Sequence, residues 1–356
     1  MNENQDLRVA EMKDGDEVVG QFLITNVTKR ASSAGKNYLN MELQDSTGSI
    51  DGKKWDVFEG DEATFANGNV VQVRGKVLSY NNSLQFKVLS GEKLDSSRVD
   101  FSRLVPSAPV SLELLKGKLQ LYIDSIGNPD VKALLLEMIK RFEDKYFIWP
   151  AAVRNHHNYL SGLLYHSITM CDLAAKTCEV YHSLNRDIVL AGVIIHDMGK
   201  TVELSAPQAT QFTLEGKLLG HISIGQAELR AAAKALHYFD YDDLSPEEQQ
   251  TSRGKELFKK KEIAVCLEHI VLSHHTKPEF GSPVAPLTRE ALAVAMIDDL
   301  DAKMMILDKA FAGVEKGGYT QKLFTMDDRY FYLPEYSVEN PAAPGTGLEE
   351  TKSDLA

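Results

Sequence analysis

Apolar and polar residues alternate with a period of two through much of the first 95 positions, as expected for β-strands with one buried face. Residues 39–44, 71–77 and 84–88 show this alternation most clearly. The segments 45–48 and 80–83 between such runs are rich in the small polar residues that form turns. We therefore predict five short strands that close into a small β-barrel.

From about position 112 to position 316 the apolar spacing changes to three and four residues, which indicates helices. Ser245–Glu248 has the N-cap serine, proline and acidic residues of a helix start. Pro106 and Pro109 interrupt the pattern before the helices, and proline, glycine and acids dominate the end of the chain. We predict four parts: a β-barrel domain at 1–95, a linker and first helix at 96–125, an all-α domain at 126–335, and a disordered acidic tail at 336–356.

The composition is that of an ordinary globular protein. The three cysteines form no CxxC pair, which indicates reduced thiols in the cytosol and no disulfide scaffold. The longest aliphatic run, Ile188–Ile195, has eight residues, whereas a membrane-spanning helix needs about 20. Residues 1–17 are polar and acidic, without the pattern of a secretory signal. We therefore expect a soluble, cytoplasmic protein with no membrane partner.

Histidines and aspartates recur in the helical region, each within an apolar helix or at its end. His166 lies on an apolar stripe, and the pair His196-Asp197 follows the aliphatic run 188–195 directly. The same description fits the rest of the series, which is His221, His274, His275 and Asp298. Taken singly, each residue has an ordinary alternative as a helix cap, a surface charge or a hydrogen-bonded core residue. Together they are better explained by one metal site.

Imidazole nitrogen and carboxylate oxygen together suit manganese, iron, zinc or similar divalent ions. Two such ions a few ångströms apart can bind a phosphate and activate a water. The series therefore predicts a metal-dependent phosphohydrolase.

The motifs around these residues resemble a known family. The order of His166, His196-Asp197 and Asp298 is similar to that of the HD superfamily of metal-dependent phosphohydrolases. Three longer segments resemble the YhaM-type 3′→5′ exoribonucleases: HHNYLSGLLYH ending at His166, HDMGK beginning at His196, and HHTKPEFGSPV beginning at His274. Ser161 departs from this pattern, since the family leads us to expect glycine there. The resemblance implies an N-terminal OB-type barrel of five strands followed by an all-α HD domain.

The resemblance also implies roles for individual residues. The first metal site would comprise His166, His196, Asp197 and Asp298. A second site would add His221 and His274, with Asp197 bridging both ions; His275 is an alternative to His274, and Asp301 to Asp298. The family implies manganese, while the ligand types alone also permit iron, cobalt or nickel. Lys200 would neutralise a phosphate oxygen during catalysis or, alternatively, be a solvated lysine, and the pair His156-His157 would contact substrate, support the ligands or cap a helix.

The barrel is the part that would bind a nucleic-acid strand. OB-folds hold single strands with aromatic stacking and a basic groove, which makes candidates of Lys36, Tyr38, Lys53, Trp55 and Lys76. The two aromatic residues have an equal claim to be barrel core or rim. The net charge of the chain is −12, and residues 1–95 hold 11 basic and 15 acidic side chains, so any basic groove must be local.

We therefore predict a 3′→5′ exoribonuclease that degrades single-stranded RNA, and single-stranded DNA as a further substrate, to nucleoside 5′-monophosphates. One alternative is a nucleotide or cyclic-dinucleotide phosphohydrolase, although small substrates need no strand-binding barrel. The other is a non-catalytic RNA-binding assembly protein, against which the complete ligand series argues. Because one acidic barrel binds RNA weakly, we also expect a homo-oligomer that combines several barrels.

Overall fold

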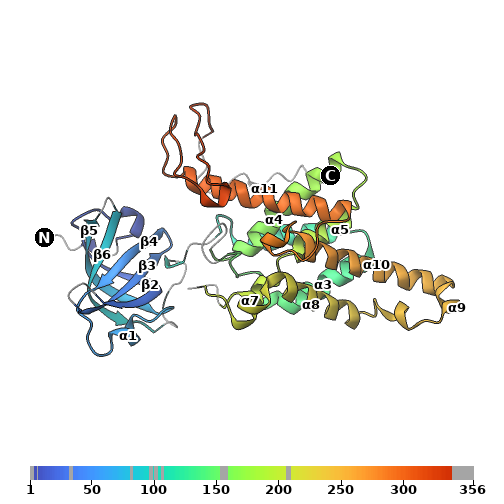
Figure 1. Cartoon of the computed structure of the whole chain (residues 1–356), viewed down its shortest axis with the longest axis horizontal. Helices are drawn as coiled ribbons and strands as arrows, with labels where there is room; N and C mark the ends of the chain where they lie inside the picture. Colours follow the sequence, from blue (N-terminus) through green and yellow to red (C-terminus); the bar gives the residue numbers. More distant parts are fainter. Residues whose placement is uncertain are drawn as a thin grey trace. The chain divides into compact units, whose positions relative to one another are not determined.

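The computed structural model describes residues 4–5, 7–31, 35–80, 83–95, 99, 103–105, 108–152, 159–205 and 210–338. The chain divides into two compact units, which are described separately below (Figure 1). The first comprises Met1–Ser107 with Ala206–Thr210, and the second comprises Ala108–Ser205 with Gln211–Ala356. The predicted tail falls largely on residues 339–356, and His156-His157 on residues 153–158, both of which lie outside the described residues.

The first unit is a closed β-barrel. Its strands are β1 (Asn4–Gln5), β2 (Glu17–Ala31), β3 (Asn37–Asp45), β4 (Gly48–Lys54), β5 (Val70–Tyr80) and β6 (Ser83–Lys93), with the short helix α1 (Asp61–Thr64) before β5. The hydrogen-bonded order is β1-β2-β3-β4-β6-β5, and β5 pairs again with β2, which closes the barrel. The two-residue β1 only adds to the edge of β2, so the predicted five-stranded barrel is confirmed.

The predicted alternation sets which side chains fill the barrel. Along β3 every second residue is buried, including Leu39, Met41 and Leu43. β2 differs from the short strand that we predicted, because it runs for 15 residues and pairs with both β3 and β5. A bulge between Thr25 and Thr28 bends β2, which allows one long strand to serve both neighbours.

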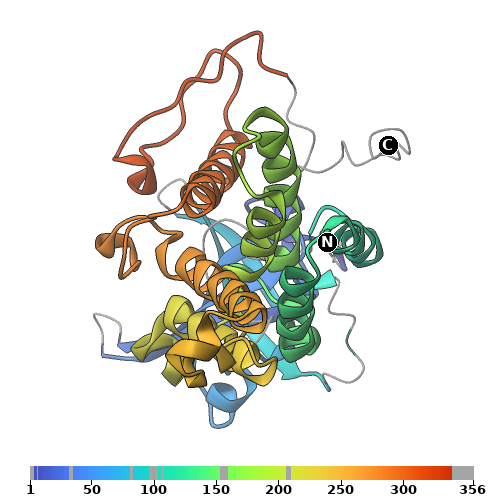
Figure 2. The same ribbon diagram turned by 90° about the vertical axis from the view of Figure 1, so that its right-hand side faces the viewer.

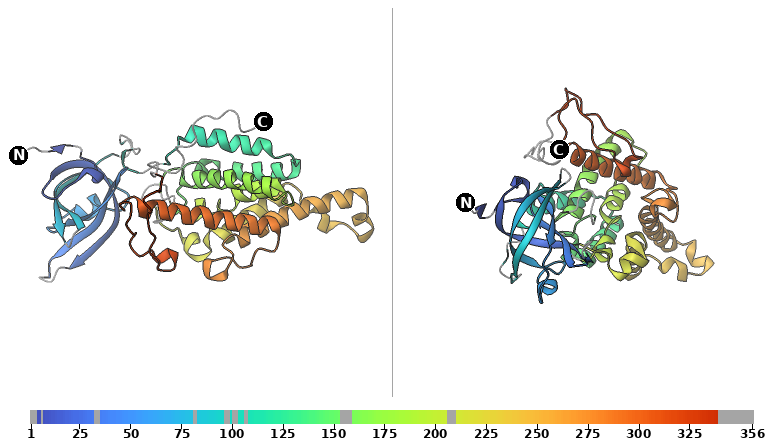
Figure 3. Two further views of the ribbon diagram at one scale, coloured as in Figure 1. Left: turned by 90° about the horizontal axis from the view of Figure 1, so that it is seen from above. Right: turned by 60° about the vertical axis from the view of Figure 1, so that its left-hand side comes forward.

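The second unit is a bundle of helices. They are α2 (Leu112–Ser125), α3 (Pro129–Tyr146), α4 (Gly162–Val180), α5 (Arg186–Ile195), α6 (Lys200–Glu203), α7 (Leu214–Leu218), α8 (Gly220–Ala235), α9 (Pro246–Gln249), α10 (Ser252–Ser273) and α11 (Arg289–Phe311). Helix α5 packs against α3, α4, α10 and α11, and its residues 188–195 are all buried. Helix α4 lies between α2 and α11 (Figure 3, left), and α8 lies beside α10 (Figure 2).

Two local predictions in this unit have instructive outcomes. The helix start at Ser245 is confirmed, with a capping box to Glu248, but α9 ends after about one turn. Thr251 then caps α10 by accepting a hydrogen bond from the Gly254 amide, so a second start signal overrides the first. Ser161, where glycine was expected, has the left-handed φ of 62° that glycine adopts most easily.

No described helix is both long and apolar enough to cross a membrane.

Candidate metal centre

Five helices deliver the predicted ligands to one place. His166 lies on α4 and Asp298 on α11, while His196 and His274 are the residues at which α5 and α10 end. Asp197 follows His196 directly, and His221 is the second residue of α8. Residues spread over more than 130 positions therefore meet around the carboxylate of Asp197.

One side of this centre contains both acidic ligands. The Asp197 Oδ2 atom lies 3.3 Å from His196 Nε2 and 3.8 Å from His166 Nε2. Asp298 Oδ1 lies 3.2 Å from His166 Nε2 and 3.9 Å from His196 Nε2. We call these four residues the first half of the centre. The donor atoms of His166, His196 and Asp197 are close enough to surround a single cation, and those of His196 and Asp298 form another such group together with His274.

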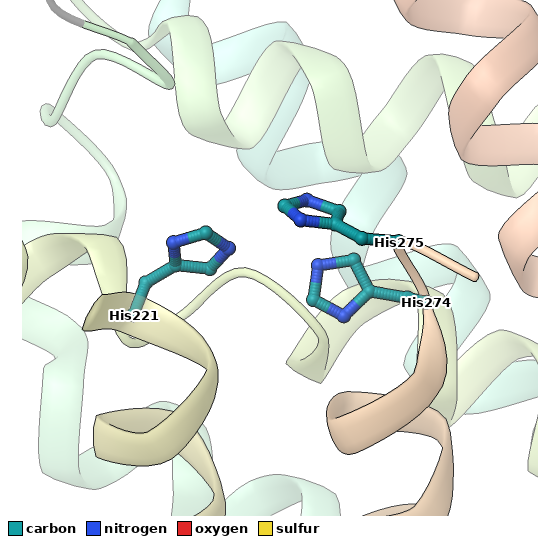
Figure 4. A group of neighbouring side chains, drawn as sticks. All are labelled: His221, His274 and His275. Carbon is teal, nitrogen blue, oxygen red and sulfur yellow. The ribbon is translucent and has the colours of Figure 1, made fainter. Parts of the chain in front are cut away.

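The other side is rich in imidazoles. Asp197 turns its second oxygen, Oδ1, to this side, 3.4 Å from His221 Nε2 and 3.7 Å from His274 Nε2. His275 joins them, because the rings of His221, His274 and His275 face one another (Figure 4) and offer nitrogens within 4.8 Å. The sequence left His274 and His275 as alternatives, whereas the structure brings both together. We call His221, His274, His275 and Asp197 the second half.

The outer nitrogen of each ring is already bonded. The Nδ1 atoms of His196, His274 and His275 lie 2.7–2.8 Å from the backbone carbonyls of Val193, Val271 and Phe280. Because a carbonyl can only accept, each of these Nδ1 atoms must carry the proton. In the neutral rings, the Nε2 lone pairs are therefore left to point into the centre, which is the arrangement that metal-binding histidines require.

Several buried polar atoms at the centre are left without a partner. Among the described residues, His196 Nε2, Asp197 Oδ1, His221 Nε2 and His274 Nε2 are buried and accept or donate no hydrogen bond. Unpaired buried polar atoms are rare because each costs free energy, and here four of them converge. Metal ions held at this centre would satisfy these atoms, so the residues present fit a metal site.

The electrostatics of the centre also favour a cation. Burial opposes the ionisation of Asp197, but the Lys200 ammonium, 2.7 Å from Oδ2, and His196 outweigh it and hold the pKa well below the usual range. Burial likewise disfavours a charged His166, yet hydrogen bonds to Asp298 and Asp301 raise its pKa to about 10. The surplus of carboxylates therefore binds positive charge, from protons or from a metal.

Two acids contact the outer nitrogens of ligand histidines, and neither contact was predicted from the sequence. Asp301, considered as a replacement for Asp298, instead bonds the outer nitrogen of His166 at 2.7 Å and so orients that ring. Glu203 lies 3.1 Å from the Nδ1 of His221 and was missed altogether. The spacing of three between Asp298 and Asp301 places both acids on one face of α11, which could have indicated that they contact the same ligand. No sequence pattern pointed to Glu203.

Gly199 does not act as the glycine stop of helix α5. Helix α5 ends at His196, and Gly199 has a right-handed backbone with φ −58°, immediately before α6. A Cβ atom there would lie 2.1 Å from the carbonyl oxygen of His221 and 2.8 Å from the Gly225 amide nitrogen. Gly199 is therefore needed because α8 approaches the HD motif so closely.

The barrel carries an aromatic and basic surface. The rings of Tyr38 and Trp55 stack with centroids 4.6 Å apart, and the Lys53 ammonium lies within 6 Å of both the Trp55 and the Tyr80 rings. Trp55 is 43% exposed, so it belongs to the rim and not to the core.

The basic residues of the barrel extend this surface. Lys53 on β4 pairs in register with Lys87 on β6, which pairs with Lys76 on β5. All three point outward in the alternation of their strands. Lys36 is an exposed residue just before β3. The barrel therefore has a local row of lysines although its overall charge is negative.

Comparison with known proteins identifies the family. The HD domain family matches residues 163–303, and the OB-fold nucleic acid binding domain family matches residues 23–94. The 3′-5′ exoribonuclease YhaM of Geobacillus sp. (strain WCH70) is 40% identical over 326 residues, which cover 91% of this chain and 94% of that protein. The chain belongs to the YhaM exoribonuclease family. The order predicted from the sequence, an OB-type barrel before a helical HD domain, is thereby confirmed, and the HD domain implies dependence on divalent metal ions.

Solved structures similar to this chain include isolated OB domains. The OB domain of Ta0387 from Thermoplasma acidophilum covers 27% of this chain and 91% of its own, with 16% identity and a TM-score of 0.22. The second OB-fold domain of replication protein A from Methanococcus maripaludis covers 26% and 99%, with 18% identity and a TM-score of 0.21. The assignment of the barrel rests on its strand order and on the family match, not on these scores.

Proposed function

We propose that this protein is a metal-dependent 3′→5′ exoribonuclease that hydrolyses single-stranded RNA, and single-stranded DNA as a further substrate, to nucleoside 5′-monophosphates. The observation that carries the proposal is the convergence of four buried, unpartnered donor atoms in a chain of the YhaM family. The dependence on a divalent ion follows from the HD domain, and the barrel supplies the nucleic-acid-binding part.

The two halves of the centre would hold two divalent ions, and Asp197 would belong to both. His166, His196 and Asp298 would complete the first half, and His221, His274 and His275 the second. The family resemblance favours manganese, and the mixture of imidazole and carboxylate also permits iron, cobalt or nickel. When bound, such ions polarise the phosphoryl oxygens and lower the pKa of a water so that it can act as a nucleophile.

The chain itself contributes orientation and charge. Asp197 fixes the spacing of the two halves because a single rigid carboxylate faces both. Lys200, whose side chain is only 13% exposed, places its ammonium 2.7 Å from Asp197, where it can neutralise charge that develops on a phosphate oxygen. Attack of water on phosphorus with departure of the ribose 3′ oxygen would release a nucleoside 5′-monophosphate.

The barrel would hold the strand upstream of the 3′ end. Stacking of bases on aromatic rings is tolerant of sequence, and Tyr38, Trp55 and Tyr80 offer such rings. The row of Lys53, Lys87 and Lys76 would follow the phosphates, with Lys36 as a further cation. A strand-binding surface of this kind supports a polymeric substrate over a free nucleotide.

The test uses the purified full chain, a 5′-labelled ribo-oligonucleotide, and Asp197→Asn beside the wild type. We expect stepwise shortening from the 3′ end with added Mn²⁺, and a loss on the order of 10³-fold in Asp197→Asn with fewer bound ions per chain. Asp299→Asn is the matched control, since its exposed carboxylate pairs with Lys303. Conversion of free nucleotides or cyclic dinucleotides without shortening of the oligonucleotide would overturn the proposal, as would tight RNA binding without turnover.

Assembly and location are part of the same proposal. Leu292, Met296, Leu300 and Met304 recur at every fourth position of α11, and each side chain is about half exposed. Such an apolar stripe supports a homo-oligomer formed through α11. A monomer in sedimentation experiments at working concentration would contradict it.

Three free cysteines support a reducing, cytoplasmic location.

A further inference from the structure

The five histidines of the centre differ in what their outer nitrogens contact. His196, His274 and His275 donate from Nδ1 to backbone carbonyls. His166 and His221 instead face carboxylates, those of Asp301 and Glu203. Each half of the centre therefore contains one histidine with an acid behind it. A carboxylate on the outer nitrogen strengthens imidazole as a metal ligand more than a neutral carbonyl does.

The two halves also differ in their own ligands. The first half has two carboxylates, Asp197 and Asp298, whereas the second half shares Asp197 and has three imidazoles; Asp298 also lies within 4.8 Å of its His274. Lys200 offsets part of the charge of the first half, because its ammonium lies 2.7 Å from Asp197 Oδ2, but Asp298 still gives that half a second carboxylate. A divalent ion should therefore bind more weakly in the second half, and the acid behind that half has more influence on its affinity.

Glu203 is held rigidly in this position. One oxygen, Oε1, accepts hydrogen bonds from the backbone amide of His221 at 3.0 Å and from its Nδ1 at 3.1 Å. Its backbone carbonyl accepts from Thr213, and Gly216 packs so closely that a Cβ there would lie 2.2 Å from that carbonyl oxygen. Glu203 is also buried, with 8% of its surface exposed. It thus fixes both the backbone and the ring of His221.

We propose that the two halves bind their ions with unequal affinity, and that Glu203 is a positioning residue whose carboxylate sets the affinity of the weaker, second half. Occupancy of the second half then follows the free concentration of the divalent ion, so the activity is switched by that concentration. The inference rests on the proposed two-ion function, but binding of the ions can be measured without any RNA.

The experiment titrates Mn²⁺ into chelator-treated full-length protein in a calorimeter. The wild type should show two binding events of different affinity. Glu203→Gln keeps an oxygen that can accept both hydrogen bonds and removes only the charge, so we expect the weaker event to lose about 10- to 100-fold in affinity while the tighter one is unchanged. Asp301→Asn should weaken the tighter event instead. Glu215→Gln, an exposed residue of the neighbouring helix α7, is the matched control and should match the wild type.

A second readout is activity on RNA as a function of Mn²⁺, where Glu203→Gln should raise the concentration for half-maximal activity by the same factor. Circular dichroism and melting curves establish that each variant is folded. Two events of equal affinity, or an unchanged weaker event in Glu203→Gln, would overturn this inference and leave the proposed function intact. Binding of a single ion per chain would instead contradict the two-ion function itself.

Discussion

Replacement of Gly199 by alanine tests whether the close approach of α8 to the HD motif positions the centre. The new Cβ would lie 2.1 Å from the His221 carbonyl oxygen, which must retreat by about 1.3 Å to reach ordinary contact at 3.4 Å. Both nearest atoms belong to backbone, so no side chain can rotate away. Overpacking of this kind costs about 1–3 kcal/mol, and a displacement of about 1 Å at a catalytic ligand costs about 10²-fold in rate.

Gly225 provides a control at the same helix crossing. A Cβ there would have its nearest neighbours at 3.5 Å and 3.6 Å, which is ordinary contact. Because Gly225 lies inside α8, alanine should stabilise that helix by about 0.5–1 kcal/mol. The two glycine-to-alanine changes should therefore shift the melting temperature in opposite directions, by about 2–4 °C per kcal/mol.

The assays are thermal melting, Mn²⁺ binding by calorimetry, and turnover of a labelled oligonucleotide. We expect Gly199→Ala to melt earlier, to lose affinity for the ion that His221 binds, and to lose activity, while Gly225→Ala keeps both functions. If Gly199→Ala binds Mn²⁺ and turns over RNA like the wild type, the contact between Gly199 and His221 does not position the second half.

Three further outcomes follow from the geometry. In metal-free protein the pKa of His166 is raised to about 10, so the bound proton stabilises the fold fully below pH 6.5 and this stabilisation is lost as the pH rises through 10. Mn²⁺ must displace that proton, so the gain in melting temperature on adding Mn²⁺ should increase from pH 7 to pH 9. A gain that stays constant over this range would contradict the prediction. Lys200→Met should lower kcat by about 10²- to 10³-fold without lowering the Mn²⁺ content measured by elemental analysis; loss of the metal would assign Lys200 a structural role. Trp55→Ala should weaken binding of a long oligonucleotide by about 1–3 kcal/mol but leave turnover of a dinucleotide unchanged, and equal effects on both would contradict a stacking role.

The fold was predictable where a pattern depends on local neighbours. The alternation in β3 gave its buried face correctly, because each residue of a strand points to the side opposite its neighbours. The length of β2 was not predictable in the same way. It depends on β3 and β5 pairing with different parts of one strand, and on a bulge that no local pattern marks.

At the candidate site, residue types were easier to predict than their partners. Imidazoles and acids in apolar surroundings indicated a metal, and the structure brings all seven predicted ligands together. The contact of Asp301 with the outer nitrogen of His166 was not predictable, because the register of α11 against α4 decides which nitrogen of His166 it reaches. Glu203 was missed because its contact with His221 depends on how α7 and α8 pack against α6.

Part of the ligand geometry is nevertheless local, and the ends of α5 and α10 show why. The last carbonyls of a helix lack the amide four residues later that would otherwise bond to them. His196 and His274 each stand at such an end, and each ring donates from Nδ1 to the carbonyl three residues earlier, on Val193 and Val271. The bond that satisfies the helix end also chooses the tautomer, which leaves Nε2 directed beyond the helix. A histidine that ends a buried apolar helix is therefore oriented as a metal ligand before any other part of the centre is in place.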